Sequence, residues 1–184
     1  AGCSDGTGLG GGTSAPLRFI TIATASSSTC GIASDSTLYC WGSNAGGGLG
    51  TPVSSSCDLL QGGSVPCSTR PLRVAGAPKL TALSGGYGYF CGLDPAGAAY
   101  CWGSIVVDID VGRSLGQTPT ALPGGVALTE IATGWNHICG VTTGSAIACW
   151  GAYDSGVRGD PTVDLSGYTP ASFTPNLVGG GLSF

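Results

Sequence analysis

The chain has few charged residues and few residues that favour helices. Only 9% of its residues are charged, and it contains no methionine, one lysine (Lys79) and one glutamate (Glu130). Glycine, in contrast, occupies 35 of the 184 positions, well above the average of about 7%. Together with serine, threonine and proline it interrupts any helical period. This composition excludes a typical helical enzyme and a disordered tail, and it leaves short strands joined by turns.

The chain also lacks a basic stripe and a long apolar run. Six Lys and Arg residues stand against ten Asp and Glu residues, for a net charge of −4, so the chain has no cluster that would neutralise nucleic-acid phosphates or bind an anionic membrane. No apolar stretch approaches the ~20 residues that span a bilayer, and the chain as given has no signal peptide. We expect no nucleic-acid partner and no membrane span. If the protein is exported, its signal peptide has been removed from the chain as given.

Nine cysteines accompany a single histidine. A zinc site would need CxxC knuckles or a set of cysteines and histidines, and neither occurs. We therefore expect no bound metal and no cofactor. Disulfides persist in oxidising compartments, so the cysteine content predicts an extracellular, periplasmic or cell-surface protein.

The tripeptide Cys-Trp-Gly marks an internal repeat. It begins at Cys40, Cys101 and Cys149. Another cysteine precedes each of these at the same spacing, and these preceding cysteines are Cys30, Cys91 and Cys139 respectively. A short stretch in which apolar and polar residues roughly alternate precedes each pair, at 19–23, 80–84 and 128–132. Such alternation is typical of strands. We therefore predict that each unit folds as a three-strand meander, followed by a fourth segment that leads to the next unit. The predicted fold class is all-β.

The turn at 94–97, Asp-Pro-Ala-Gly, predicts the central hairpin of the second unit. Pro95 fixes the φ angle of a type I turn, and Gly97 can take the left-handed position of a three-residue loop. Counting outward from this turn places Cys91 opposite Cys101, where Cβ atoms are ~4.5–5.5 Å apart and near disulfide range. The same count applies to the other units. The predicted cross-strand disulfides are Cys30–Cys40, Cys91–Cys101 and Cys139–Cys149.

The full pattern resembles the repeat of the regulator of chromosome condensation family (RCC1-like repeats). Residues 80–103 carry the resemblance best, with Gly86, the Cys-Gly-Leu at 91–93, Gly97, Tyr100 and the Trp-Gly at 102–103. Gly-Leu-Gly at 48–50 and Ser-Leu-Gly at 114–116 resemble the tail of that repeat. The resemblance implies β-propeller blades of roughly 50 residues each. The extra cysteines resemble the variant found in exported bacterial proteins.

The resemblance organises the whole chain, 1–184, as a single β-propeller region. The expected repeats are approximately 17–70, 71–123 and 124–178, with partial blades at 1–16 and 179–184. A Ser- and Gly-rich loop is inserted at 51–70 and is expected to be closed by a fourth disulfide, Cys57–Cys67; a smaller insertion lies at 105–113. Three blades cannot close a ring, because propellers typically have about 4–8. The chain is therefore either a piece of a longer propeller or completes itself by association.

Three features suggest chemistry, and each has a simpler interpretation. His137 could act as a general base, but Tyr89 and Ser28 occupy the same register position, so a structural role is favoured. The acidic residues Asp108 and Asp110 lack the further ligands of a calcium loop and fit a solvated connection. The same holds for three aspartates spread along a later connection, Asp154, Asp160 and Asp164. No nucleophile elbow, phosphate loop or carboxylate pair accompanies them.

Cys3 is the cysteine left without a predicted partner. It could form a disulfide with another chain or with a missing repeat. It could also carry a lipid anchor, because Ala1-Gly2-Cys3-Ser4 resembles the end of a bacterial lipoprotein signal, although Ala1 and Gly2 would then be removed.

Aromatic residues suggest two kinds of contact. Trp41, Trp102 and Trp150 recur once per repeat, which indicates packing between blades. Four further side chains lie between the first and second strands of their units and could form one partner-binding patch on a rim: Tyr87, Tyr89, Trp135 and His137. The alternative is that these rings are separate and partly buried.

The sequence favours an exported, non-enzymatic protein-binding or assembly scaffold, with a protein partner or self-association, as in a subunit of a larger surface complex. An inhibitor or regulator that acts on an enzyme through the propeller rim is the alternative. A propeller hydrolase or lyase would need carboxylates around a central channel, and a chain with one glutamate offers few.

Overall fold

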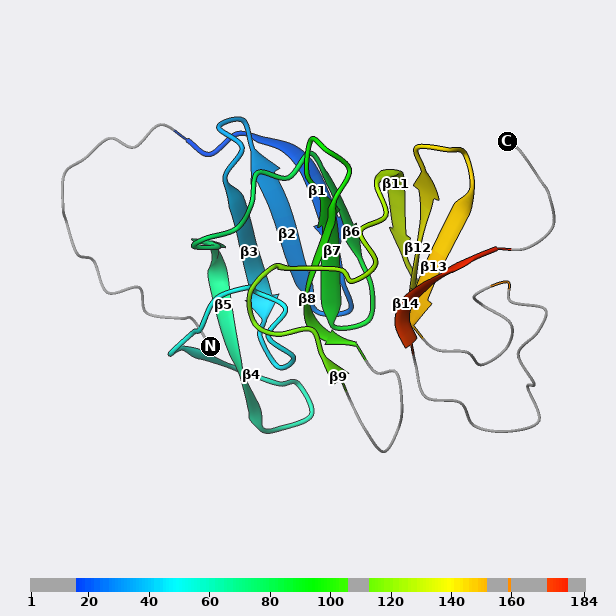
Figure 1. The fold of residues 1–184 in the computed structure, drawn as a ribbon. Helices are drawn as coiled ribbons and strands as arrows, with labels where there is room; N and C mark the ends of the chain where they lie inside the picture. Colours follow the sequence, from blue (N-terminus) through cyan, green and yellow to red (C-terminus); the bar gives the residue numbers. More distant parts are fainter. Residues whose placement is uncertain (1–15, 106–112, 152–158, 160–171, 179–184) are drawn as a thin grey trace, which may run out of the picture.

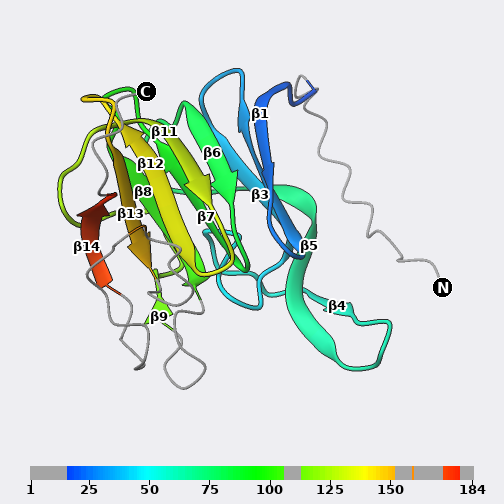
Figure 2. The same ribbon diagram turned by 90° about the vertical axis from the view of Figure 1, so that its right-hand side faces the viewer.

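The computed structural model describes residues 16–105, 113–151, 159 and 172–178. These residues form strands and turns only, in three antiparallel sheets that lie side by side (Figures 1 and 2). No helix long and apolar enough to cross a bilayer occurs in this part of the chain. Several predicted features lie outside the described residues: the partial blades at both ends, Cys3, and the five aspartates Asp108, Asp110, Asp154, Asp160 and Asp164.

The first sheet contains the first predicted repeat. Its strands run in the order β1-β2-β3-β5-β4. The strands are β1 (Phe19–Thr24), β2 (Ser28–Ala33), β3 (Leu38–Ser43), β4 (Ser56–Asp58) and β5 (Ser64–Arg73). We call this sheet the first blade.

The second and third sheets repeat the meander of the first. The second blade has the order β10-β8-β7-β6, with β9 also paired to β8. The third blade has the order β11-β12-β13-β14. The strands are β6 (Ala82–Gly85), β7 (Tyr89–Leu93), β8 (Ala99–Ile105), β9 (Arg113–Ser114), β10 (Thr120–Ala121), β11 (Leu128–Thr133), β12 (His137–Thr142), β13 (Ile147–Gly151) and β14 (Ser172–Leu177). The all-β, blade-type architecture predicted from the repeat is confirmed.

Each blade has a disulfide across its central hairpin. The paired cysteines face each other in the strand register, with Cα atoms 4.1 Å apart in all three blades. In the second blade the predicted turn is present: Gly97 has a φ of 83°, and the Asp94 carboxylate accepts hydrogen bonds from the backbone N–H groups of Ala96 and Ala98. Serine takes the corresponding left-handed position in the other two blades, at Ser36 and Ser145.

The segment predicted as an inserted loop contains a second hairpin. Strand β4 pairs with the first half of β5, and Cys57 and Cys67 form the fourth disulfide, with Cα atoms 5.7 Å apart. The second half of β5 pairs with β3 and supplies the outer strand of the first blade. The hairpin thus extends beyond the blade edge (Figure 2) while remaining hydrogen-bonded to it.

The core lies between the blades. One cluster of buried side chains fills the space between the first and second blades, and another fills the space between the second and third blades. Glycine in the second strand of a blade allows this close packing. A Cβ at Gly92 would lie 2.7 Å from Cδ1 of Leu80, and a Cβ at Gly140 would lie 2.6 Å from Cδ1 of Leu128. Each leucine therefore rests directly on the backbone of the neighbouring strand.

Candidate functional site

A tryptophan joins the second blade to the first, and another joins the third blade to the second. Trp102 is fully buried, stacks on Phe90 with ring centroids 5.8 Å apart, and donates a hydrogen bond of 3.0 Å from Nε1 to the carbonyl of Gly48 in the first blade. Trp150 is also buried and donates a bond of 3.1 Å to the carbonyl of Pro123. Because a buried indole N–H requires a partner, each junction combines apolar packing with one directed hydrogen bond.

Three register positions form the face that a blade turns toward its predecessor. The first position lies at or just before the start of the first strand of each blade, the second lies on that strand, and the third lies on the third strand. In the second blade they are Leu80, Leu83 and Trp102; in the third they are Leu128, Ile131 and Trp150. All six side chains are buried or partly buried within the two interblade clusters.

The first blade presents the same face with much of it exposed. Phe19 is 38% exposed and Ile22 is 62% exposed. Trp41 is half-buried, since the Phe19 ring packs on it at 5.6 Å and also meets Tyr39 at 6.1 Å. We call Phe19, Ile22, Tyr39 and Trp41 the open face. The repeated tryptophan is recognisable in the sequence, whereas the exposure of the apolar residues of β1 is not.

The rim carries one exposed aromatic pair. Tyr87, in the β6–β7 connection, is 52% exposed, and Trp135, in the β11–β12 connection, is 66% exposed. Their ring centroids are 5.6 Å apart in a T-shaped arrangement. The structure thus brings together two of the four predicted rim residues, which come from adjacent blades.

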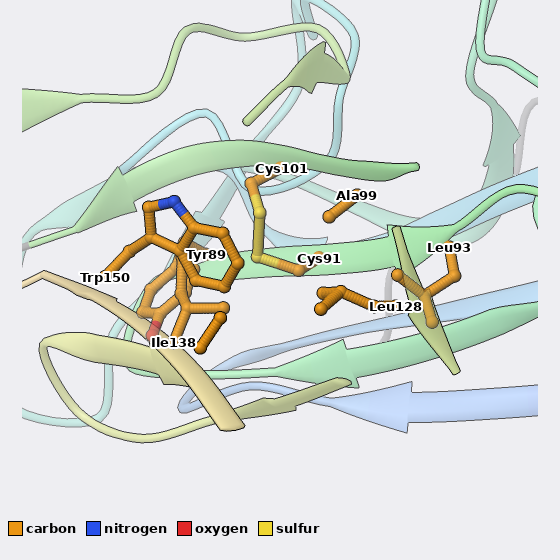
Figure 3. Packing of buried hydrophobic residues seen from close by; sticks show 9 residues of the cluster. Tyr89, Cys91, Leu93, Ala99, Cys101, Leu128, Ile138 and Trp150 are labelled. Atoms are coloured by element: carbon orange, nitrogen blue, oxygen red, sulfur yellow. A yellow bond between two sulfur atoms is a disulfide. The ribbon is translucent and has the colours of Figure 1, made fainter. Parts of the chain in front are cut away.

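Tyr89 does not belong to this exposed surface. It is fully buried, and its hydroxyl donates toward the carbonyl oxygens of His137, at 2.7 Å, and Gly134, at 3.1 Å. Figure 3 shows its ring beside Trp150 and Ile138 between the second and third blades. Burial raises the pKa of the Tyr89 phenol well above its usual value, because the charged form is poorly solvated there. Neighbouring strand residues point to opposite faces: Phe90 packs toward the first blade, whereas Tyr89 packs toward the third. Tyr89 therefore supports the junction between the second and third blades from inside.

His137 is half-buried and also lies apart from the aromatic pair. Its imidazole covers Gly134 so closely that a Cβ on that glycine would overlap the ring. The Nδ1 atom is buried and has no hydrogen-bond partner among the described residues. No group of three or more His, Cys, Asp or Glu side chains in the described part of the chain is arranged to hold a metal ion.

An open, uncharged hollow of about 290 Å³ is lined by Tyr87 and lies between the first and second blades. Serine, glycine and alanine supply the rest of its wall: Ser26, Ser27, Ser28, Ser43, Ala45, Gly46, Gly48, Gly88 and Ser104. Ser28 is only 8% exposed, and the described residues offer its hydroxyl no hydrogen bond. This hollow was not predicted from the sequence, although a small serine, Ser28, at the register position of Tyr89 was a signal for it.

Comparison with solved structures supports the architecture. Human WBSCR16 matches with a TM-score of 0.61, 18% sequence identity and 91% of this chain covered. Yeast RCC1 (Prp20), in its complex with Kap60, matches with a TM-score of 0.65, 19% identity and 89% coverage. Prp20p from Saccharomyces cerevisiae, solved in a study of its binding to Gsp1p and histones, gives a TM-score of 0.62, 19% identity and 89% coverage.

These similarities show an RCC1-like propeller fold. The chain spans 41%, 37% and 39% of the three matched chains, about two fifths of their length. No family model and no curated protein sequence matches the chain. The predicted fold is therefore confirmed, and the four disulfides are typical of proteins from an oxidising environment.

Proposed function

We propose that the protein is an exported, non-enzymatic scaffold that assembles through its propeller blades. The observation that carries this proposal is the open face. Phe19, Ile22 and Trp41 occupy positions that are covered wherever a preceding blade is present. Exposed apolar patches of this kind mark interaction sites.

The chemistry of the open face indicates what covers it. In the second blade the equivalent tryptophan bonds to a carbonyl in the Gly-Leu-Gly segment of the blade before it, where Leu49 is fully buried. The partner of Trp41 is therefore another blade of the same repeat type, which supplies a backbone carbonyl and an apolar side chain. A second copy of this chain and a further blade of a longer propeller both meet this requirement.

Two further parts of the proposal rest on separate features. Four disulfides support export to an extracellular, periplasmic or cell-surface location. The exposed pair Tyr87 and Trp135 supports a second contact surface on the rim, because aromatic side chains anchor many protein partners. Tyr89 is buried in the junction between the second and third blades, so this part of the proposal rests on Tyr87 and Trp135 alone.

Sedimentation equilibrium under non-reducing conditions tests the scaffold proposal. The protein carries Cys3→Ser, so that association cannot depend on that thiol. We expect concentration-dependent association, which Ile22→Asp weakens at least about tenfold because a charge would be buried at the contact. Leu59→Asp is the matched control, since Leu59 is also exposed but lies near the β4–β5 hairpin.

The comparison between the two variants decides the outcome. Association that Leu59→Asp leaves unchanged and Ile22→Asp abolishes supports the open face as the contact. A chain that stays monomeric at every concentration, or that associates equally with Ile22→Asp, contradicts the proposal.

A further inference from the structure

The two interblade junctions differ at one register position. Between the second and third blades this position is Tyr89, whose buried ring fills the junction and whose hydroxyl bonds to the next blade. Between the first and second blades the position is Ser28, which lines the hollow. The small side chain does not fill the space that a ring fills in the other junction. The hollow thus occurs where the repeat departs from its own pattern.

The wall of the hollow carries no charged side chain and combines serine residues with apolar surface. The five serines contribute hydroxyl groups, and the wall contains no Lys, Arg, Asp or Glu side chain. Several neighbouring polar groups already bond within the protein: Ser43 accepts from the backbone of Ala45, and the Gly88 carbonyl accepts from the backbone of Ser104. The Ser28 side chain is largely buried, yet its hydroxyl has no such partner among the described residues and is not among their enclosed polar atoms, so it remains open to the hollow. It is therefore free to donate to, and accept from, a ligand in the hollow.

An aromatic ring forms the outer wall. Tyr87 lines the hollow, and Trp135 supports it edge-on from the neighbouring blade with ring centroids 5.6 Å apart. This contact limits the movement of Tyr87 although the side chain is half exposed. The result is a supported ring at the mouth of a hydroxyl-rich hollow.

We propose that the hollow binds one ring of a neutral sugar, as the terminal unit of a glycan. A sugar ring has an apolar C–H face that can pack on Tyr87 and hydroxyl groups that both donate to and accept from the serines and the backbone. Phosphate, sulfate and carboxylate ligands are disfavoured because no cation lines the wall. The volume is at the lower end of the ~300–1,000 Å³ range of ligand pockets, which suits a single ring.

This proposal names the ligand class of the rim surface and rests on that part of the proposed function. It does not depend on the open face, which lies on the other side of the first blade. Failure of sugar binding would leave the association of the chain through Ile22 and Trp41 untouched, so the two proposals can fail separately.

Titration with soluble neutral disaccharides, followed by NMR, tests the proposal. The probes are maltose, cellobiose, lactose, mannobiose and diacetylchitobiose, each up to about 10 mM, because a shallow single-ring site is expected to bind with a dissociation constant of about 1 mM. The reporters are the Tyr87 ring and the indole N–H of Trp135. We expect at least one probe to shift both signals saturably, and the anionic probe sialyllactose to bind no better than lactose.

Four variants locate the ligand. Tyr87→Ala should weaken binding about tenfold, whereas Tyr87→Phe retains the ring and most of the affinity. Ser28→Ala should weaken binding about fivefold through the loss of a hydroxyl that hydrogen-bonds to the ligand. Gly48→Ala places a methyl group in the wall, 3.4 Å from Oγ of Ser28 and 3.6 Å from the Gly88 carbonyl, without backbone strain; it should abolish binding.

Ser34→Ala, which removes an exposed hydroxyl far from the hollow, is the matched control and should bind as the parent does. Equal thermal melting of the control and Ser28→Ala shows that the fold is intact. If no probe shifts the two reporters, or if Gly48→Ala and Ser28→Ala bind a probe as tightly as the control, the hollow is not a sugar site.

Discussion

Replacing Tyr89 by phenylalanine removes one hydroxyl from the junction between the second and third blades. In the native protein this hydroxyl lies 2.7 Å from the His137 carbonyl and 3.1 Å from the Gly134 carbonyl, inside the core. The His137 carbonyl keeps a second partner, the backbone N–H of Gly134, but the Gly134 carbonyl loses this bond. A buried carbonyl without its partner costs about 1–3 kcal/mol. We therefore expect Tyr89→Phe to lower the free energy of unfolding by about 1–2 kcal/mol at pH 7.

The effect should disappear at alkaline pH, and the sign follows from the raised pKa of Tyr89. In the unfolded chain a tyrosine ionises near pH 10, whereas burial keeps the folded Tyr89 neutral above that pH. Its contribution is fully present below about pH 10 and is lost as pH rises toward the folded pKa. The loss is about 1.4 kcal/mol per pH unit. At about pH 11 the native protein should thus have lost the advantage that it holds over Tyr89→Phe.

Urea denaturation at pH 7 and at about pH 11 measures both effects. The proteins carry Cys3→Ser, which removes the one cysteine without a predicted partner and so limits thiol attack on the disulfides at high pH. Tyr87→Phe is the matched control, because Tyr87 is exposed and lies two residues before Tyr89, and it should change stability by less than about 0.5 kcal/mol at pH 7. Equal stability of native protein and Tyr89→Phe at pH 7, or a difference that stays constant to pH 11, would refute the reasoning.

Three further changes test the packing and the turns by chemical denaturation. Gly86→Ala places a Cβ inside the Tyr89 ring and should destabilise by at least about 2 kcal/mol; a change below about 0.5 kcal/mol would contradict the close approach. Ser145→Gly relieves a left-handed backbone with a φ of 60° and should stabilise the protein by about 0.5–1 kcal/mol; a destabilised variant would contradict the left-handed turn. Replacing both Cys91 and Cys101 by alanine should cost about 2–3 kcal/mol; an unchanged midpoint would show that the clamp contributes nothing.

The hairpins were predictable from the sequence because local chemistry determines them. The turn at Pro95 and Gly97 fixes the register, and the register places Cys91 opposite Cys101. The equal cysteine spacing then extends the same geometry to the other blades. The repeated Trp102-type position was also recognisable, since a large ring that recurs once per repeat must lie where repeats meet.

The rim and the hollow were harder to predict because they depend on contacts between repeats. Tyr87 and Tyr89 lie two positions apart, but Tyr87 precedes β7 in a connection whereas Tyr89 begins the strand. Only the strand residue is directed into the junction. The β4–β5 hairpin was likewise expected as a loop, because its Ser- and Gly-rich composition gives little alternation. The second half of β5 pairs with the edge of β3, a contact that the sequence of the segment itself does not reveal.

Hydrogen exchange of the Trp41 indole N–H tests the central claim, that the open face is a blade-to-blade contact. We expect the indole N–H groups of Trp102 and Trp150 to exchange slowly at every concentration, since both are buried and bonded. Trp41 should exchange rapidly in the dilute chain and slowly once the chain has associated, because a partner's carbonyl then accepts its hydrogen bond. Rapid exchange of Trp41 in the associated protein would contradict the account.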